Sequence, residues 1–140
     1  MPALDHTAAS LRIFGDDLDP LEITRLLGHE PSSAERKGQE IVGKSTRAIR
    51  VARTGSWYLV AERRAPGDLD AQIVEILSKL SSDLGVWQQL AERFRIDLFC
   101  GLFLRGGTGG EVVSAKSMAA LGSRGIELGL DIYGGDDSDT

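Results

Sequence analysis

The chain has 140 residues and a formal net charge of −5, the size of one ordinary domain that can bury a core without disulfides or metals. Hydrophobic residues make up 41% and charged residues 26% of it, as in a globular protein, and neither a membrane span nor a signal peptide is recognisable. The single cysteine, Cys100, excludes an internal disulfide and fits a reducing, cytoplasmic setting. We therefore expect one cytoplasmic domain over residues 1–140, with disordered tails at residues 1–7 and 134–140.

The stretch 10–32 predicts a strand followed by a capped helix. Residues 11–14 favour a half-buried strand. Asp19 is placed to cap a helix that begins at Pro20, because its carboxylate can accept hydrogen bonds from the free N–H groups of the first turn. Gly28 can adopt the left-handed conformation that ends a helix. The acidic residues between strand and helix could bind a metal, but a cap and a solvated turn explain them without one.

The middle of the chain changes from polar to β-forming. Residues 30–45 are rich in glycine and serine, which predicts a long loop. The segments 46–53 and 57–62 contain β-branched and aromatic residues and are separated by Thr-Gly-Ser, which predicts a β-hairpin. Asp68 then caps a long helix with leucine and isoleucine at helical spacing, and Gly85 separates it from a shorter helical segment.

The last third predicts two strands around a helix. Arg95–Leu104 is apolar on both faces, as in a central strand covered at least in part on both sides. Ser114 caps a further helix that ends at Gly125. Ile126–Tyr133 alternates between apolar and polar residues, which predicts one buried and one exposed face. Together the elements predict an α+β fold: a mixed, largely antiparallel sheet with helices mainly on one face, a ferredoxin-like βαββαβ core and a C-terminal αβ extension.

Three segments carry a family resemblance: LRIFGDDLDPLEITRLLG near the N-terminus, Gly-Ser-Trp before a strand, and GIELGLDIYG near the end. From about Ala9 to Gly134 the chain resembles a bacterial family catalogued only as a domain of unknown function, number 4279 in that series. The matching segments are capped helices and core strands, so they indicate the fold more than the chemistry. The resemblance brings no established activity, cofactor or catalytic residue. It implies an immunity-type role, in which a small bacterial domain binds and blocks a toxin.

One segment matches a phosphate-binding pattern. The pattern G-x-x-x-x-G-K-S has Gly38, Gly43, Lys44 and Ser45 at its defining positions. In such a loop the backbone N–H groups hold phosphates, the lysine contacts the terminal phosphates and the serine binds Mg²⁺. That function needs a strand directly before the loop and a helix directly after it. Here a polar segment precedes and β-branched residues follow, so nucleotide binding is an alternative to the leading interpretation.

Basic residues gather in the middle of the chain. Residues 35–64 contain eight basic and three acidic residues, a surplus of five positive charges that leaves −10 for the rest. We interpret Arg47, Arg50, Arg53 and Trp57 as a candidate surface for a protein partner. The acidic remainder argues against a nucleic-acid partner, and a charge-protected edge strand would explain the same residues without any partner.

The sequence shows no set of catalytic or metal-binding residues. Its two histidines have no cysteine partners for a zinc site, and Cys100 lies in an apolar run. Glu127 and Asp131 share one face of the last strand, where a solvated surface explains them as well as acid–base chemistry does. We therefore expect no cofactor and no enzymatic activity. The leading hypothesis is a non-enzymatic domain that binds a protein partner or a second copy of itself; the alternatives are nucleotide binding through residues 38–45 and a small-ligand pocket between sheet and helices.

Overall fold

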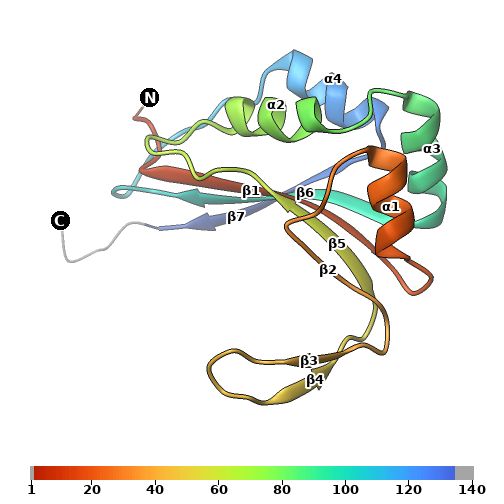
Figure 1. Ribbon diagram of the computed structural model, residues 1–140. Helices are drawn as coiled ribbons and strands as arrows, with labels where there is room; N and C mark the ends of the chain where they lie inside the picture. Colours follow the sequence, from red (N-terminus) through yellow and green to blue (C-terminus); the bar gives the residue numbers. More distant parts are fainter. Residues whose placement is uncertain (1, 135–140) are drawn as a thin grey trace.

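The computed structural model describes residues 2–134 and shows an α+β fold, as predicted. Its elements are β1 (His6–Gly15), α1 (Pro20–Leu27), β2 (Ser33–Glu35), β3 (Glu40–Val42), β4 (Ile49–Val51), β5 (Gly55–Val60), α2 (Leu69–Lys79), α3 (Leu84–Arg93), β6 (Arg95–Phe103), α4 (Ala115–Ser123) and β7 (Glu127–Tyr133). Five strands form a mixed sheet in the order β2-β5-β1-β6-β7, in which β6 and β7 run parallel and the other neighbours antiparallel. The helices lie on one face of this sheet, and β3 and β4 form a separate hairpin on its other side (Figure 1). No helix within residues 2–134 has the length and apolar composition that a bilayer span requires.

The first strand and helix form where the sequence predicts them. The Asp19 carboxylate accepts a hydrogen bond from the Leu21 N–H at 3.0 Å, and Pro20 is the first helical residue. Gly28 has φ 80° and closes the helix with its N–H on the Thr24 carbonyl. These residues act through local hydrogen bonds, which is why a sequence pattern can locate them.

The core lies between the sheet and the helices. Leu11 of β1 is fully buried and lies between Leu59 of β5 and Leu98 of β6 in the register of the sheet. Trp57 and Trp87 are the largest fully buried side chains. The indole N–H of Trp57 donates to Thr24 Oγ1 at 3.1 Å and that of Trp87 to the Ser81 carbonyl at 2.7 Å, so neither polar tip is left unpaired in the core.

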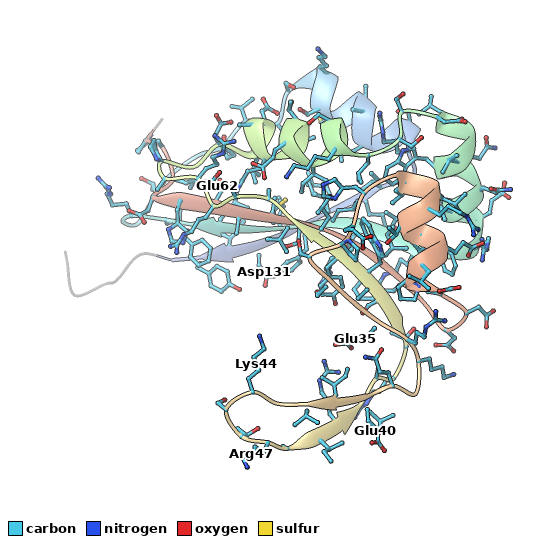
Figure 2. All side chains as sticks on the ribbon, viewed as in Figure 1. Glu35, Glu40, Lys44, Arg47, Glu62 and Asp131 are labelled. Carbon is cyan, nitrogen blue, oxygen red and sulfur yellow. The ribbon has the colours of Figure 1, made fainter. Side chains whose placement is uncertain are left out.

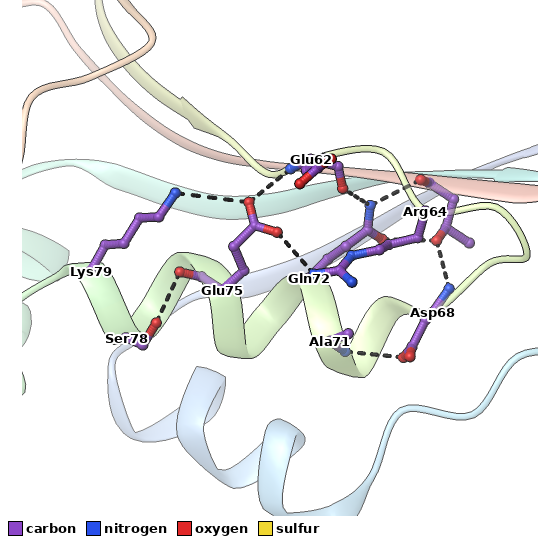
Figure 3. A network of polar contacts seen from close by, with 9 residues as sticks. Glu62, Arg64, Asp68, Ala71, Gln72, Glu75, Ser78 and Lys79 are labelled. Atoms are coloured by element: carbon purple, nitrogen blue, oxygen red, sulfur yellow. Dashed lines mark hydrogen bonds and ion pairs between the residues drawn. The ribbon is translucent and has the colours of Figure 1, made fainter.

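A buried polar network joins α2 to the sheet (Figure 3). Gln72 is fully buried and donates through Nε2 to the carbonyls of Thr7 and Glu62 at 2.9 and 3.0 Å. The Thr7 hydroxyl donates to Gln72 Oε1 at 2.8 Å and accepts from the Asp68 N–H at 2.9 Å. Every polar atom of the Gln72 side chain therefore has a partner, which is what keeps a buried amide tolerable.

The hairpin predicted for the middle of the chain is wrong. β4 pairs with β3, whereas β5 pairs with β1 and β2. Gly55, expected in a turn, is instead the first residue of β5 and is buried against β1: an added Cβ would lie 2.7 Å from the Gly15 carbonyl oxygen. Residues 30–45, expected to be a loop, contain β2 and β3. The first error arises because local pattern reading pairs strands that are adjacent in sequence, and here the long-range pairing of β5 with β1 wins. The second arises because β2 and β3 have three residues each, too few to show an alternating pattern.

The prediction of a disordered N-terminal tail is also wrong for the described residues. Leu4 and Thr7 are buried, and β1 already begins at His6. Residue 1 and residues 135–140 of the predicted tails lie outside the described residues.

The burial predicted for the last strand is wrong for most of its length. Ile126 is buried, but Leu128, Leu130 and Ile132 on the same side of β7 are exposed. Their register partners on β6 are buried beneath the helices, so the helix layer ends before the edge of the sheet. The helices cover one face of β6. On its other face, Phe99 and Phe103 are partly exposed.

Candidate functional site

The sheet face opposite the helices is open within residues 2–134, because no helix of the described chain covers it (Figure 1). The burial of β1 alternates residue by residue, so its odd-numbered positions pack beneath the helices and its even-numbered positions point the other way. We call this surface the open face. Its larger side chains are His6, Arg12 and Phe14 of β1, Tyr58 and Val60 of β5, Arg95, Asp97, Phe99 and Phe103 of β6, and Glu127, Asp131 and Tyr133 of β7.

An ion pair occupies the centre of the open face. Arg12 Nε and Nη2 donate to Asp97 Oδ1 and Oδ2, each at 2.8 Å. The Arg12 guanidinium also lies 4.4 Å from the centre of the Phe99 ring and 5.1 Å from that of Phe14. The hydrogen bonds to Asp97 raise the pKa of Arg12, so its charge is fixed at every physiological pH. This group can orient and stack, but it cannot exchange a proton.

Three stacked rings cross the open face beside this pair. The His6 and Phe103 ring centres are 3.9 Å apart, and those of Phe103 and Tyr133 are 4.6 Å apart. The Tyr133 hydroxyl donates to Asp131 at 3.2 Å, and that hydrogen bond raises the pKa of Tyr133. The Phe103 ring lies over Gly101, where an added Cβ would be 2.9 Å from it. The result is a ridge of ring edges on three strands, with the outer faces of its two end rings uncovered by the stack, which can contact apolar groups of a partner.

The hairpin of β3 and β4 forms an arm, residues 36–53, that extends below the open face (Figure 1). Three ion pairs hold its base: Arg36 to Asp19 at 2.7 Å, Lys37 to Asp16 at 3.1 Å, and Arg50 to Glu35 at 2.6 Å. Hydrogen bonding to Lys37 lowers the pKa of Asp16, and hydrogen bonding to Glu35 raises that of Arg50. All three pairs are partly exposed, so they orient the arm more than they stabilise it.

The tip of the arm is exposed and basic. Among residues 2–134, Lys44 and Arg47 have no acidic side chain within ion-pair distance. In Figure 2, Lys44 points from the tip toward the sheet and Arg47 points away from it. Val42, Ile49 and Val51 share one side of the hairpin by their register, and each is more than half exposed. The tip thus combines free positive charge with an uncovered apolar row.

The structure places the phosphate-pattern residues in this arm. Gly38 precedes β3 with φ 85°, and the second glycine, Gly43, begins a turn in which Arg47 also has a positive φ, of 53°. Lys44 and Ser45 lie within that turn, and β4 follows it. The strand-loop-helix arrangement that presents N–H groups to phosphates is therefore not formed here.

The predicted partner residues separate into two groups. Arg47, Arg50 and Arg53 are exposed on or beside the arm, although Arg50 is paired with Glu35. The prediction for Trp57 is wrong, because its side chain is fully buried on the helix side of β5 and cannot touch a partner. Sequence reasoning missed the ring stack; the available signal was that Phe103 and Tyr133 each end a strand, on the face opposite its apolar row.

The described residues form several concavities, one of them beside the open face and another in the helix layer. The first, of about 460 Å³, lies where the arm meets the open face and is lined by Phe14, Arg50 and Tyr58 among others. The second is an apolar groove of about 530 Å³ between α2 and α4, with Ile73 and Arg124 in its lining. This groove lies between two helices, so it is a different place from the predicted small-ligand pocket between the sheet and the helices.

No catalytic group stands out among the described residues. Cys100 is fully buried, and this burial raises the pKa of its thiol to about 12, so it is a poor nucleophile. Within residues 2–134, no three His, Cys, Asp or Glu side chains gather as metal ligands would. What the site offers chemically is stacking, apolar contact and fixed positive charge.

Comparison with known proteins places the chain in a family. A family model described as domain of unknown function (DUF4279) matches residues 5–135, so the chain belongs to that family, as the sequence resemblance indicated. No curated protein and no solved structure matches the chain significantly.

Proposed function

We propose that this family member is a protein-binding domain whose arm binds an acidic partner. The arm supports this proposal most directly. A two-stranded hairpin is marginally stable by itself in water, yet this one exposes three β-branched side chains and, at its tip, two cations without ion-pair partners among the described residues. An uncovered surface of this kind is typical of an interaction site.

The charge and the apolar row favour a protein as the partner. Covering Val42, Ile49 and Val51 would contribute roughly 1 kcal/mol each, because each is already partly buried by its neighbours. Lys44 and Arg47 would steer an acidic surface toward the arm, whereas the acidic remainder of this chain repels a nucleic-acid backbone. An immunity-type role, in which the partner is a toxin, is one form of this proposal. A cytoplasmic location is also part of the proposal, because a chain with a single cysteine fits a reducing compartment.

The experiment is affinity capture from a lysate of the source organism, followed by reconstitution with the purified captured protein. Arg47→Glu is expected to weaken the reconstituted complex at least about tenfold, because it reverses an unpaired charge at the arm tip. Lys116→Glu on α4 is the matched control: an equal change of charge in the helix layer, expected to leave affinity unchanged.

Two results would contradict the proposal. One is a partner that binds wild type and Arg47→Glu equally. The other is a single-stranded oligonucleotide that binds with strong salt dependence and loses affinity in Arg47→Glu, since that would make the arm a nucleic-acid contact.

Nucleotide binding through residues 38–45 is the alternative. Its test is a thermal shift with ATP or GTP and Mg²⁺, on wild type and on Lys44→Ala. A stabilisation that Lys44→Ala abolishes would favour the nucleotide, and no shift at millimolar nucleotide would discard it.

A small-molecule ligand in the groove between α2 and α4 is the second candidate. Arg124 Nε is buried at this groove without a hydrogen-bond partner among the described residues, and an unpaired buried donor favours an anionic group nearby. A thermal-shift screen of small apolar carboxylates tests this, with Arg124→Met expected to abolish any stabilisation.

We also infer that the core is ferredoxin-like. β1 and β2 each pair antiparallel with β5, so they run parallel to each other with β5 inserted between them, as in a split βαβ unit. β6 lies on the other side of β1, which makes α4 and β7 the extension and the arm an insertion. A solved family structure with a different strand order would contradict this assignment.

A further inference from the structure

β7 is an edge strand whose helix side carries no charged residue. It pairs on one side with β6, and no other strand among residues 2–134 covers its second side. Natural edge strands are commonly shielded by charged side chains, proline or a bulge. β7 contains no proline, and its two acids, Glu127 and Asp131, both lie on the open-face side. On its helix side, Leu130 is 49% and Ile132 is 63% exposed. The strand thus exposes unpaired backbone groups beside an apolar row.

The backbone groups that face outward can be identified. The Tyr133 carbonyl accepts from the Leu104 N–H at 2.9 Å, so Tyr133 directs its backbone polar groups toward β6. Successive residues of a strand alternate in this direction. Leu128, Leu130 and Ile132 therefore present their N–H and C=O groups at the free edge.

We propose that β7 pairs antiparallel with β7 of a second copy, in a register centred on Leu130. This register sets Leu130 opposite Leu130 and Leu128 opposite Ile132 of the second copy. All three outward residues then form hydrogen-bonded pairs, which exchange about six N–H···O=C bonds in total. The same pairs bring the exposed apolar side chains into cross-strand contact on the helix side.

The charges of β7 select this register. With the centre at Leu130, Asp131 lies opposite Gly129 and Glu127 lies opposite Tyr133, so no two acids face each other directly. Moving the centre to Gly129 loses one hydrogen-bonded pair and sets Glu127 opposite Asp131. Moving it to Asp131 loses one pair as well and sets the two Asp131 side chains opposite each other. Like charges directly opposite are destabilising, so the strand is self-complementary in one register and self-repelling in its neighbours.

The dimer joins two five-stranded sheets into one, with both arms free. A single pair of edge strands is a small interface, so we expect a dissociation constant of about 1–100 µM. The two Asp131 side chains remain diagonal neighbours across the axis. Because salt screens that repulsion and the net negative charge of each copy, the dimer is expected to tighten as ionic strength rises.

Sedimentation velocity of the full chain over a concentration series tests the proposal. Wild type is expected to shift from monomer to dimer, and Leu130→Lys to raise the dissociation constant at least about tenfold by placing two cations opposite each other on the axis. Leu21→Lys is the matched control, since Leu21 is an exposed leucine on α1, away from β7. Circular dichroism confirms that each variant is folded.

Cross-linking tests the register independently of affinity. Leu130→Cys sets two thiols opposite each other with Cα atoms about 5.5 Å apart, within the range of a disulfide, so mild oxidation is expected to yield a covalent dimer. Ile132→Cys sets its two copies four positions apart along the strand pair and is expected to stay uncross-linked. A monomer at all concentrations, a dimer insensitive to Leu130→Lys, or equal cross-linking of both cysteine variants would overturn the proposal. So would a monomer whose β7 binds an unrelated extended peptide.

Discussion

Replacing Gln72 by leucine removes a buried amide while keeping a side chain of similar length. Three hydrogen bonds are lost: two donated by Gln72 Nε2 and one accepted by Oε1 (Figure 3). At about 1 kcal/mol each the loss is about 3 kcal/mol. Two circumstances moderate it, because the Thr7 carbonyl keeps the Arg64 N–H at 3.1 Å and Glu62 is exposed, so its carbonyl is close to water. We expect Gln72→Leu to lower the free energy of unfolding by about 2–3 kcal/mol.

Thr7→Val completes a double-mutant cycle with Gln72→Leu. The valine removes the hydroxyl that donates to Gln72 and accepts from the Asp68 N–H, at an expected cost of about 1–3 kcal/mol. The double variant should lose about 1 kcal/mol less than the sum, because the bond shared by the two side chains is counted once. Urea unfolding followed by tryptophan fluorescence measures all four proteins, since Trp57 and Trp87 are fully buried when folded. A Gln72→Leu variant within 0.5 kcal/mol of wild type would refute the reasoning.

Three further predictions concern stability and reactivity. Gly28→Ala should destabilise by about 1 kcal/mol, since φ 80° strains any side chain, whereas Gly122→Ala, with open space around the added Cβ, should stabilise α4 by about 0.5 kcal/mol; urea unfolding compares them, and equal effects would contradict the assignment. The hydrogen bonds from Arg93 lower the pKa of Glu22, so the stability from this pair is present above the unfolded pKa, about 4.5, and disappears as pH falls through the folded pKa. Wild type should therefore lose more stability than Glu22→Gln between about pH 5 and pH 3 in urea titrations, and parallel curves would exclude the pair as the cause. The Cys100 thiol should react with Ellman's reagent at pH 8 only after unfolding, because it is buried and its pKa is about 12; rapid labelling of the native protein would show the core to be open.

The amino-acid sequence by itself determined the elements that form through local interactions. Asp19, Asp68 and Ser114 each cap the helix predicted for them, through hydrogen bonds to N–H groups two or three residues away. Gly28 ends the first helix because its backbone can adopt a positive φ. The α+β class also followed from the sequence, since the change between helical and alternating hydrophobic spacing is readable along the chain. The family resemblance was carried by these same segments.

Only the tertiary structure decided which strands pair and which faces stay uncovered. β5 lies beside β1, forty or more positions away in sequence, instead of beside β4, so Trp57 is buried in the core rather than on a partner surface. Leu130 and Ile132 have the alternation of a buried strand face, yet they are exposed because the helix layer does not reach β7. The period of a strand states which residues share a face. Whether another layer covers that face depends on where distant helices pack. The surfaces proposed for binding are the faces and edges that those helices leave uncovered.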